Sequence, residues 1–201
     1  MSHTPRQYSV PHLENKIPVA ILGATWMVGR RFAELLAEHP YFEVTEVAAS
    51  QSSYGKKYGA LVESRGYGVP STLAWLTLGS VQELTREKAR LVFSAFEGTK
   101  EEILRTESEL ANRGFMVVSN NSAHRWTKDV PMMLPEVNPD HLKLIEEQTS
   151  YKEASGGIIV KPNCSIQSYV PVLKAWEEFG IQDIFVVTEQ SISGAGKTFA
   201  E

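Results

Sequence analysis

Short apolar runs alternate with amphipathic segments along the chain. Six runs have the character of buried strands, namely residues 18–22, 42–49, 91–96, 115–118, 156–160 and 184–190. Four segments carry apolar side chains at helical spacing or begin with a helix-starting residue: 30–38, 100–112, 138–148 and 164–180. Strands that alternate with helices predict an α/β fold, a doubly wound parallel sheet of the Rossmann type.

The first predicted strand runs directly into a glycine-rich turn, Gly23-Ala24-Thr25-Trp26-Met27-Val28-Gly29. A strand, such a turn and a helix in this order indicate dinucleotide binding, with the pyrophosphate at the helix N-terminus. Gly23 allows the tight turn, and Gly29 lets the helix pack close to the strand. Trp26 stands where a third glycine normally lets the backbone approach the pyrophosphate. Its indole is expected either to block the phosphates or to swing outward and cover them. A turn without any ligand is the alternative.

The end of the second predicted strand favours NADP over NAD. An NAD site usually has Asp or Glu here to bind the ribose 2′-hydroxyl. Residues 50–57 instead offer the hydroxyls of Ser50, Ser52 and Ser53 and the two amines of Lys56 and Lys57. These groups suit a 2′-phosphate, although a solvated polar loop would look the same. Ser94 is a small residue at the end of the strand predicted at 91–96, where cofactors lie in such sheets.

Cys164 is the only cysteine, and it follows a predicted strand and a Pro162-Asn163 turn. A helix is expected to begin at this residue, and its N-terminus favours a thiolate, which is the nucleophilic form. A small buried apolar residue is the alternative reading of a single cysteine. The polar loop 119–125 ends with Arg125, whose guanidinium can bind phosphate or carboxylate. His124 beside it is either a base or a structural hydrogen-bonding group.

Composition argues against several other classes of protein. The 201 residues carry a net charge of -4 without a basic run, which argues against nucleic-acid binding. No apolar run approaches membrane-spanning length, and residues 1–16 lack the apolar core of a signal peptide and are expected to form a flexible arm. One cysteine excludes an internal disulfide framework and a cysteine-based zinc site, no metal site is predicted, and a reducing, cytoplasmic location is expected.

Five motifs occur in one order along the chain: the turn at 23–29, Ser119 to Arg125, Asp129-Val130-Pro131 with Pro135 to Asn138, Pro162 to Ser165, and Gln190 with Ser193 to Gly196. Together they resemble aspartate-semialdehyde dehydrogenases, closest to the archaeal and fungal branch, over about residues 17–198. The resemblance implies reversible NADP-dependent reduction of aspartyl phosphate to aspartate semialdehyde through a cysteine thioester, on the route to lysine, threonine and methionine. A small-molecule substrate and phosphate are the implied partners, and the full-length enzyme is expected to be a homodimer or homotetramer.

The resemblance also assigns roles to residues. Cys164 matches the nucleophile, Arg125 the phosphate-binding residue, and Gln190 and Asn163 substrate contacts. The expected cofactor-binding residues are Gly23, Thr25, Trp26, Met27, Val28, Ser50, Ser52, Ser53, Ser94, Ser193 and Gly194. Members of the family are longer, and their catalytic His, their substrate-carboxylate Arg and a second phosphate-binding Lys match positions beyond residue 201.

The chain is therefore expected to contain an NADP-binding domain over 17–160 and the beginning of an α+β catalytic and dimerisation domain over 161–201, with little or no activity alone. Two alternatives remain. One is a related reductase for another acyl phosphate or acyl-CoA, such as N-acetylglutamyl phosphate or malonyl-CoA. The other is a non-catalytic nucleotide-binding fragment.

Overall fold

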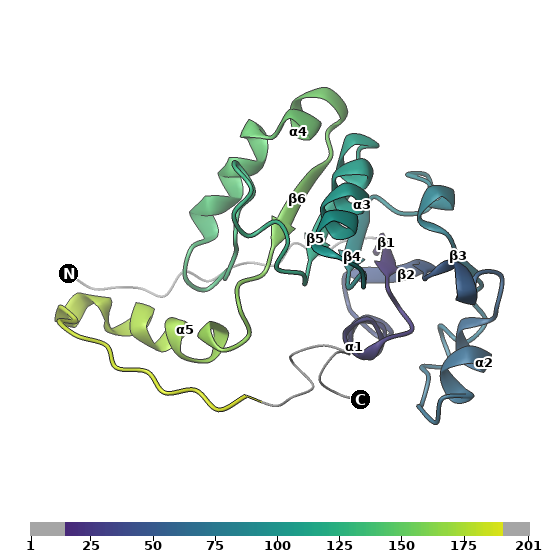
Figure 1. Ribbon diagram of the computed structural model, residues 1–201, viewed down its shortest axis with the longest axis horizontal. Coiled ribbons are helices and arrows are strands. Elements are labelled where there is room, and N and C mark those ends of the chain that lie inside the picture. Colours follow the sequence, from purple (N-terminus) through teal and green to yellow (C-terminus); the bar gives the residue numbers. More distant parts are fainter. Residues whose placement is uncertain (1–14, 191–201) are drawn as a thin grey trace. The chain divides into compact units, whose positions relative to one another are not determined.

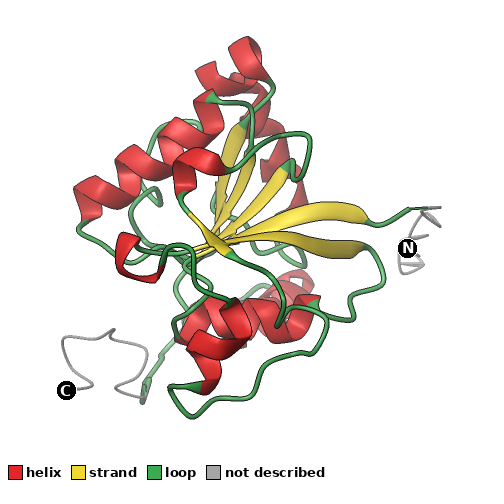
Figure 2. Cartoon of the chain, turned by 90° about the vertical axis from the view of Figure 1, so that its right-hand side faces the viewer, coloured by secondary structure: helices red, strands yellow, loops and turns green. Residues whose placement is uncertain are grey.

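The computed structural model describes residues 15–190, in which strands and helices alternate along the chain (Figure 1, Figure 2). The described part divides between Phe96 and Glu97 into two compact units, which are described one at a time. The first unit contains β1 (Ile17–Leu22), α1 (Met27–Leu36), β2 (Phe42–Ala48), the 3-10 helix η1 (Gln51–Ser53), α2 (Tyr58–Glu63), β3 (Leu78–Gly79), the 3-10 helix η2 (Val81–Glu83) and β4 (Leu91–Ser94).

The strands of the first unit are all parallel and lie in the order β3-β2-β1-β4. The chain moves outward from β1 through β2 to β3 and then returns to β4 on the other side of β1. The strand order therefore reverses between β1 and β4, and ligands of doubly wound sheets bind beyond the carboxyl ends of the strands at such a point. The predicted fold class is confirmed, and the glycine-rich turn after β1 lies at this reversal.

The core of the first unit is one cluster of buried apolar side chains from its strands and helices. Buried side chains of β1 and β2 pack against α1, α2 and the segment before β3; they include Val19, Ile21, Ala33, Leu36, Val44, Val47, Tyr58, Val62, Leu73, Leu76 and Leu78. Burial raises the pKa of Tyr58 to about 12, so its phenol stays neutral inside this core. The core holds α1 against β1 and thereby fixes the turn that joins them.

The second unit contains α3 (Lys100–Asn112), β5 (Met116–Ser119), the 3-10 helix η3 (Pro139–Glu147), α4 (Thr149–Ala154), β6 (Gly157–Val160), α5 (Ile166–Trp176) and the 3-10 helix η4 (Glu177–Phe179). Strands β5 and β6 pair in parallel, and α3 packs on both. The sequence Thr99-Lys100-Glu101-Glu102 predicts a capping box at the start of α3, and the structure contains it: Glu102 N donates to Thr99 Oγ1, and Thr99 N donates to a Glu102 carboxylate oxygen.

Strand β6 is held at its outer edge by a side chain and by a short extended segment. The amide of Gln148 accepts from Ile158 N at 2.8 Å and donates to Ile158 O at 2.8 Å, as a neighbouring strand would. Val160 then pairs with residues 131–133, because Val160 N donates to Pro131 O and Met133 N donates to Val160 O. The backbone that leads to Cys164 is therefore fixed on both sides up to residue 160.

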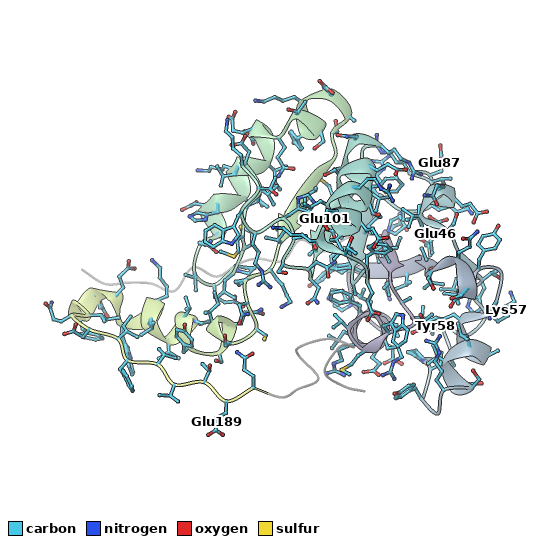
Figure 3. All side chains as sticks on the ribbon, in the orientation of Figure 1. Glu46, Lys57, Tyr58, Glu87, Glu101 and Glu189 are labelled. Carbon is cyan, nitrogen blue, oxygen red and sulfur yellow. The ribbon has the colours of Figure 1, made fainter. Side chains whose placement is uncertain are left out.

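The strand predicted at 184–190 is wrong. Residues 181–190 have no regular secondary structure and are exposed, and Glu189 points away from the chain in Figure 3. An isolated extended segment gains no hydrogen-bond ladder, and within residues 15–190 no strand pairs with this one. Helix α5 has no buried residue. None of the helices in the described part of the chain has both the length and the hydropathy required to cross a bilayer.

Candidate functional site

The turn between β1 and α1 depends on its two glycines. Gly23 has a φ of 80°, and a Cβ atom on it would lie 2.2 Å from the carbonyl oxygen of Ala95, directly after β4. A Cβ atom on Gly29 would lie 2.0 Å from the carbonyl oxygen of Gly23. Real Cβ atoms do not approach other atoms so closely, so a side chain at either position would force the turn, the helix or β4 apart. Both roles assigned to these glycines from the sequence agree with this geometry.

The N-terminus of α1 offers donors for an anion. The first N–H groups of a helix have no partner within it, and the N-cap residue Trp26 supplies no capping side-chain bond. Met27 and Val28, the first two helical residues, are exposed. The hydroxyl of Thr25 is buried in the same turn and has no hydrogen-bond partner among the described residues. Because a buried hydroxyl normally has a partner, this turn fits a ligand that accepts hydrogen bonds.

Trp26 is only partly buried, and a cation holds it in place. Arg65 follows α2 in the chain. Its guanidinium lies 5.0 Å from the centroid of the Trp26 ring and donates to the Thr25 carbonyl oxygen at 3.0 Å. A second guanidinium, of Arg30 in α1, lies 3.3 Å from the centroid of the Tyr67 ring. The turn is thus flanked by two positive charges that aromatic rings position. Whether the indole covers or blocks the phosphates stays a prediction.

The two lysines of the polar loop after β2 have different hydrogen-bond partners. The hydroxyls of Ser50 and Ser52 lie 3.0 Å apart, and Lys56 Nζ donates to the Ser52 carbonyl oxygen at 2.9 Å. Ser53 is buried. Lys57 Nζ instead donates to the Trp75 carbonyl oxygen and to the Thr77 hydroxyl, at 2.9 and 3.0 Å. The Lys56 ammonium group therefore lies beside the serines predicted to bind the 2′-phosphate. The Lys57 ammonium group instead joins the loop to the segment before β3.

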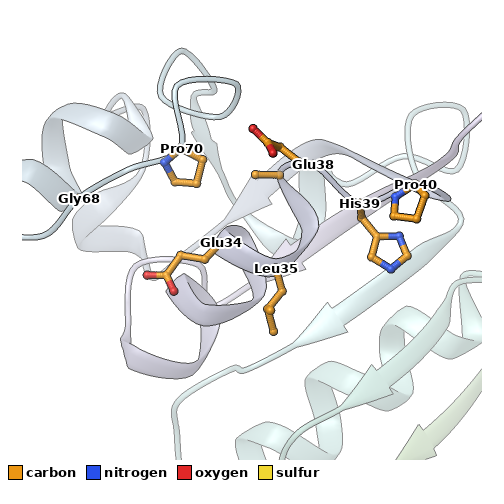
Figure 4. A pocket seen from close by; sticks show the side chains of 8 residues that line it. Glu34, Leu35, Glu38, His39, Pro40, Gly68 and Pro70 are labelled. Carbon is orange, nitrogen blue, oxygen red and sulfur yellow. The ribbon is translucent and has the colours of Figure 1, made fainter.

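Ser94 lies next to the turn after β1, whereas the surface hollow lies away from it. Ser94 ends β4, pairs in register with Leu22 and is fully buried, so it lies beside the start of the turn. The hollow in Figure 4 is formed at the opposite end of α1, and its lining includes Glu34, Glu38, His39 and Pro70. None of the residues predicted to bind a cofactor lines it. The hollow is therefore not the candidate nucleotide site.

In the second unit Arg125 contacts the backbone just before Asn163 and Cys164. Arg125 is half-buried, and it donates through Nε to the Lys161 carbonyl oxygen at 3.2 Å and through Nη2 to the Pro162 carbonyl oxygen at 3.3 Å. Asn163 Oδ1 accepts from Ser165 N at 2.9 Å, and the Cys164 thiol lies 3.9 Å from it. Cys164 is exposed. The expectation of a buried apolar cysteine is thus disfavoured, and the helix begins at Ile166, two residues later than expected.

A buried acid holds the loop that carries Arg125. Glu107 of α3 is fully buried, and its Oε1 accepts from Ser119 Oγ at 2.8 Å and from Asn121 Nδ2 at 3.0 Å. His124 is also buried, with its Nε2 3.8 Å from Glu107 Oε2 and its Nδ1 3.2 Å from Thr127 Oγ1. Burial lowers the pKa of His124, against the opposite effect of Glu107. This placement favours the structural role of His124 over the role of a base.

Gln190 stands apart from these groups among the described residues. Gln190 is exposed at the end of the irregular stretch, and within residues 15–190 no hydrogen bond joins it to Arg125 or Cys164. Ser193 and Gly194 lie outside the described residues. Their roles stay predictions.

Sequence reasoning missed Arg65, Glu107 and Lys161. Lys161 had a usable signal, since it is a cation at the carboxyl end of a strand three residues before the cysteine. Arg65 and Glu107 had none, because their partners are 40 and 12 or more residues away in sequence.

Comparisons with known proteins identify the family of this chain. Residues 18–145 match the family described as semialdehyde dehydrogenase, NAD binding domain. An aspartate-semialdehyde dehydrogenase of Archaeoglobus fulgidus is 38% identical over 89% of this chain and 51% of its own length. A malonyl CoA reductase (NADP) of Metallosphaera sedula is 34% identical over 92% of this chain and 51% of its own. The chain spans about half the length of the curated relatives it matches.

A solved structure is similar as well. The crystal structure of aspartate semialdehyde dehydrogenase with NADP from Candida albicans superposes with a TM-score of 0.70 and 32% sequence identity, over 83% of this chain and 48% of that one. The similarity therefore extends from the sequence to the arrangement of the backbone.

Proposed function

The chain belongs to the semialdehyde dehydrogenase family through its NAD-binding domain, and from this we propose that it binds NADP and carries the nucleophile of an NADP-dependent aspartate-semialdehyde dehydrogenase. One observation carries the proposal. The chain combines a dinucleotide turn, built on Gly23 and Gly29, with an exposed Cys164 whose neighbouring backbone is bound by Arg125. The exposure leaves the thiol open to a substrate, and the contacts of Arg125 hold its guanidinium at the backbone just before the thiol.

The residues of the first unit fit NADP. The open N–H groups of Met27 and Val28 and the unpartnered hydroxyl of Thr25 suit the pyrophosphate. Arg65 adds a positive charge beside the same turn. Ser50, Ser52 and Lys56 offer two hydroxyls and one ammonium group to a 2′-phosphate, and none of them is a carboxylate that would repel it. When bound, NADP supplies the hydride acceptor, or NADPH the donor, of the reaction.

The residues of the second unit supply the covalent chemistry. In the oxidative direction the Cys164 sulfur attacks the aldehyde carbon of aspartate semialdehyde, and the carbonyl oxygen becomes the alkoxide or hydroxyl of a thiohemiacetal. That carbon loses a hydride and the oxygen loses its proton, which leaves a thioester on Cys164. Phosphate oriented by Arg125 then attacks the thioester carbon, and the sulfur leaves as thiolate with aspartyl phosphate as product. A thiolate suits both steps because it is a good nucleophile and a fair leaving group.

Lys56 should discriminate NADP from NAD. We expect Lys56→Gln to weaken NADP binding by roughly 10- to 100-fold, the effect of one hydrogen bond to a charged group, with little change in NAD binding. Lys57→Gln is the matched control, because Lys57 is already bonded to Trp75 and Thr77. Calorimetric titration of both variants with both nucleotides measures this. Equal losses in the two variants, or an equal loss for NAD, would mean that Lys56 does not bind the 2′-phosphate.

Cys164→Ser should remove catalysis and keep cofactor binding. At stoichiometric protein, with aspartate semialdehyde, NADP and phosphate, we expect slow formation of NADPH that needs phosphate. The general base of the family matches no residue here, and such a loss commonly costs about 10²–10⁴ in rate. Cys164→Ser should lower the remaining rate by at least roughly 10³-fold, because serine lacks the nucleophilic thiolate. The experiment follows NADPH absorbance; a rate that the substitution leaves unchanged would refute the role of Cys164.

A second candidate is an acyl-CoA reductase, because one relative is a malonyl CoA reductase (NADP) of similar identity. The same assay separates the two activities. A parallel arm contains malonate semialdehyde and coenzyme A in place of aspartate semialdehyde and phosphate. Formation of NADPH in this arm alone would favour the second candidate.

The full-length enzyme is proposed to be a homodimer or homotetramer that works in a reducing, cytoplasmic setting. The free, exposed thiol of Cys164 supports the reducing setting. Exposed apolar side chains of α5 and the stretch after it, among them Trp176, Phe179 and Phe185, support burial against further protein. Sedimentation of the full-length protein tests the assembly, and a monodisperse monomer would contradict it.

A further inference from the structure

Three side chains donate to a single backbone carbonyl next to Cys164. The Pro162 carbonyl oxygen accepts from Arg125 Nη2 at 3.3 Å, from Lys161 Nζ at 3.3 Å and from Gln167 Nε2 at 3.1 Å. A carbonyl oxygen has two lone pairs, and N–H···O bonds are usually 2.7–3.2 Å long. Three donors at 3.1–3.3 Å therefore share an acceptor that can satisfy only two of them well. At least one donor is available to another acceptor.

Two of these donors carry positive charge, and within residues 15–190 neither has a carboxylate within 4.0 Å. Burial lowers the pKa of Lys161, the Arg125 charge lowers it further, and the Cys164 group facing it acts in the opposite direction. The two cations thus lie close enough to repel each other. A like charge nearby disfavours the charged form of each group, and a bound anion would relieve this repulsion.

We propose that Lys161 joins Arg125 in binding the phosphate group beside Cys164, with Gln167 remaining on the Pro162 carbonyl. The inference rests on the proposed function and extends it to a residue without an assigned role. The ligand is a small dianionic phosphate, either inorganic phosphate or the phosphoryl group of an acyl phosphate. Arg125 presents a planar fork of N–H groups, and Lys161 adds a compact charge that can turn from the carbonyl to a phosphate oxygen.

The position of Lys161 is set by backbone contacts and not by a flexible surface loop. Lys161 N donates to the Ser119 carbonyl oxygen at 3.0 Å, at the end of β5. Its own carbonyl oxygen accepts from Arg125 Nε. The two cations are therefore held together by the backbone of residues 161 and 162. An anion that bridges them would contact side chains held on the carbonyl groups of residues 161 and 162, and Cys164 follows two residues later in the chain.

The test measures phosphate binding by the 201-residue chain. Inorganic phosphate is titrated at constant ionic strength, and the readouts are calorimetry and protection of Cys164 from alkylation by iodoacetamide. We expect Lys161→Met, which keeps the side-chain stem and removes the charge, to weaken phosphate binding by roughly 10-fold or more. Lys161→Arg should retain most of the affinity. Lys152→Met is the matched control, because Lys152 is an exposed lysine of the same unit that pairs with Glu147.

The outcomes separate this inference from the proposed function. Unchanged phosphate affinity in Lys161→Met, or no phosphate binding by the wild-type chain, overturns the inference, and the proposed function stands if NADP still binds. Loss of phosphate binding in Lys161→Met with NADP binding intact supports both. Protection of Cys164 by coenzyme A but not by phosphate overturns the assignment of a small phosphate. If Lys161→Met does not fold, Lys161→Gln with Lys161→Arg provides the same comparison.

Discussion

Gly29→Ala is expected to destabilise the first unit by at least about 3 kcal/mol and to abolish measurable NADP binding. The added methyl group would lie 2.0 Å from the Gly23 carbonyl oxygen and 2.8 Å from the Ala24 Cα atom. Both contacts are with backbone, so no side chain can rotate away to relieve them. The helix must move away from the turn, and its first N–H groups move with it.

A second glycine provides the control for this substitution. Gly68 lies in the same unit, has no atom within 4 Å of a Cβ built on it, and has no positive φ. Gly68→Ala should change the free energy of unfolding by less than about 0.5 kcal/mol and leave NADP binding intact. Urea unfolding followed by circular dichroism, together with an NADP titration, measures both effects. Similar stability of the two variants would show that α1 does not pack on the turn as described.

Glu107→Ala is expected to cost about 3–5 kcal/mol, the range for breaking a buried charged network by removing one partner. The hydroxyl of Ser119 and the amide of Asn121 would lose their common acceptor inside the protein. Glu109→Ala, on the exposed side of the same helix, is the control and should cost less than about 1 kcal/mol. Because the network holds the loop ahead of Arg125, Glu107→Ala should also weaken phosphate binding. A loss of stability no larger than that of Glu109→Ala would contradict this account.

The same network predicts how stability depends on pH. The pKa of His124 is lower in the folded protein than its usual value of about 6.5 in an unfolded chain. The unfolded state therefore binds more protons between the two pKa values, and stability falls as the pH drops below about 6.5. The loss is complete once the pH is below the folded pKa. Replacing His124 with glutamine should flatten this part of the profile in urea titrations at several pH values.

In the first unit β1, α1, β2 and β4 were predictable because their signals are local, whereas α2 and β3 were not predicted. The strand, the glycine turn and the helix are adjacent in sequence, and the steric roles of Gly23 and Gly29 follow from that order. The capping box of Thr99 and Glu102 is likewise contained in four residues. Cys164 and Arg125 were found through motifs, and the structure brings Arg125 to the backbone just before the cysteine.

The parts that were missed depend on distant partners. Residues 184–190 have strand-like composition, but a strand forms only where a neighbour completes its hydrogen bonds. The proposed role of Arg65 depends on its contact with the turn, 40 residues earlier in the sequence. Lys161 has a local signal, but its proposed partner Arg125 lies 36 residues earlier in the sequence. A pattern of apolar residues carries no information about such pairings. The sequence also made Lys56 and Lys57 equal candidates for binding the 2′-phosphate. They are distinguished in the structure by the hydrogen-bond acceptors of their ammonium groups.

Calorimetric titration of the folded 201-residue chain with NADP and with NAD tests the central claim most directly. We predict saturable binding of one NADP per chain, tighter than NAD and lost on Gly29→Ala, because the turn after β1, the serines after β2 and Lys56 together recognise the pyrophosphate and the 2′-phosphate. A folded chain that binds neither nucleotide, or that binds NAD more tightly than NADP, would contradict the account.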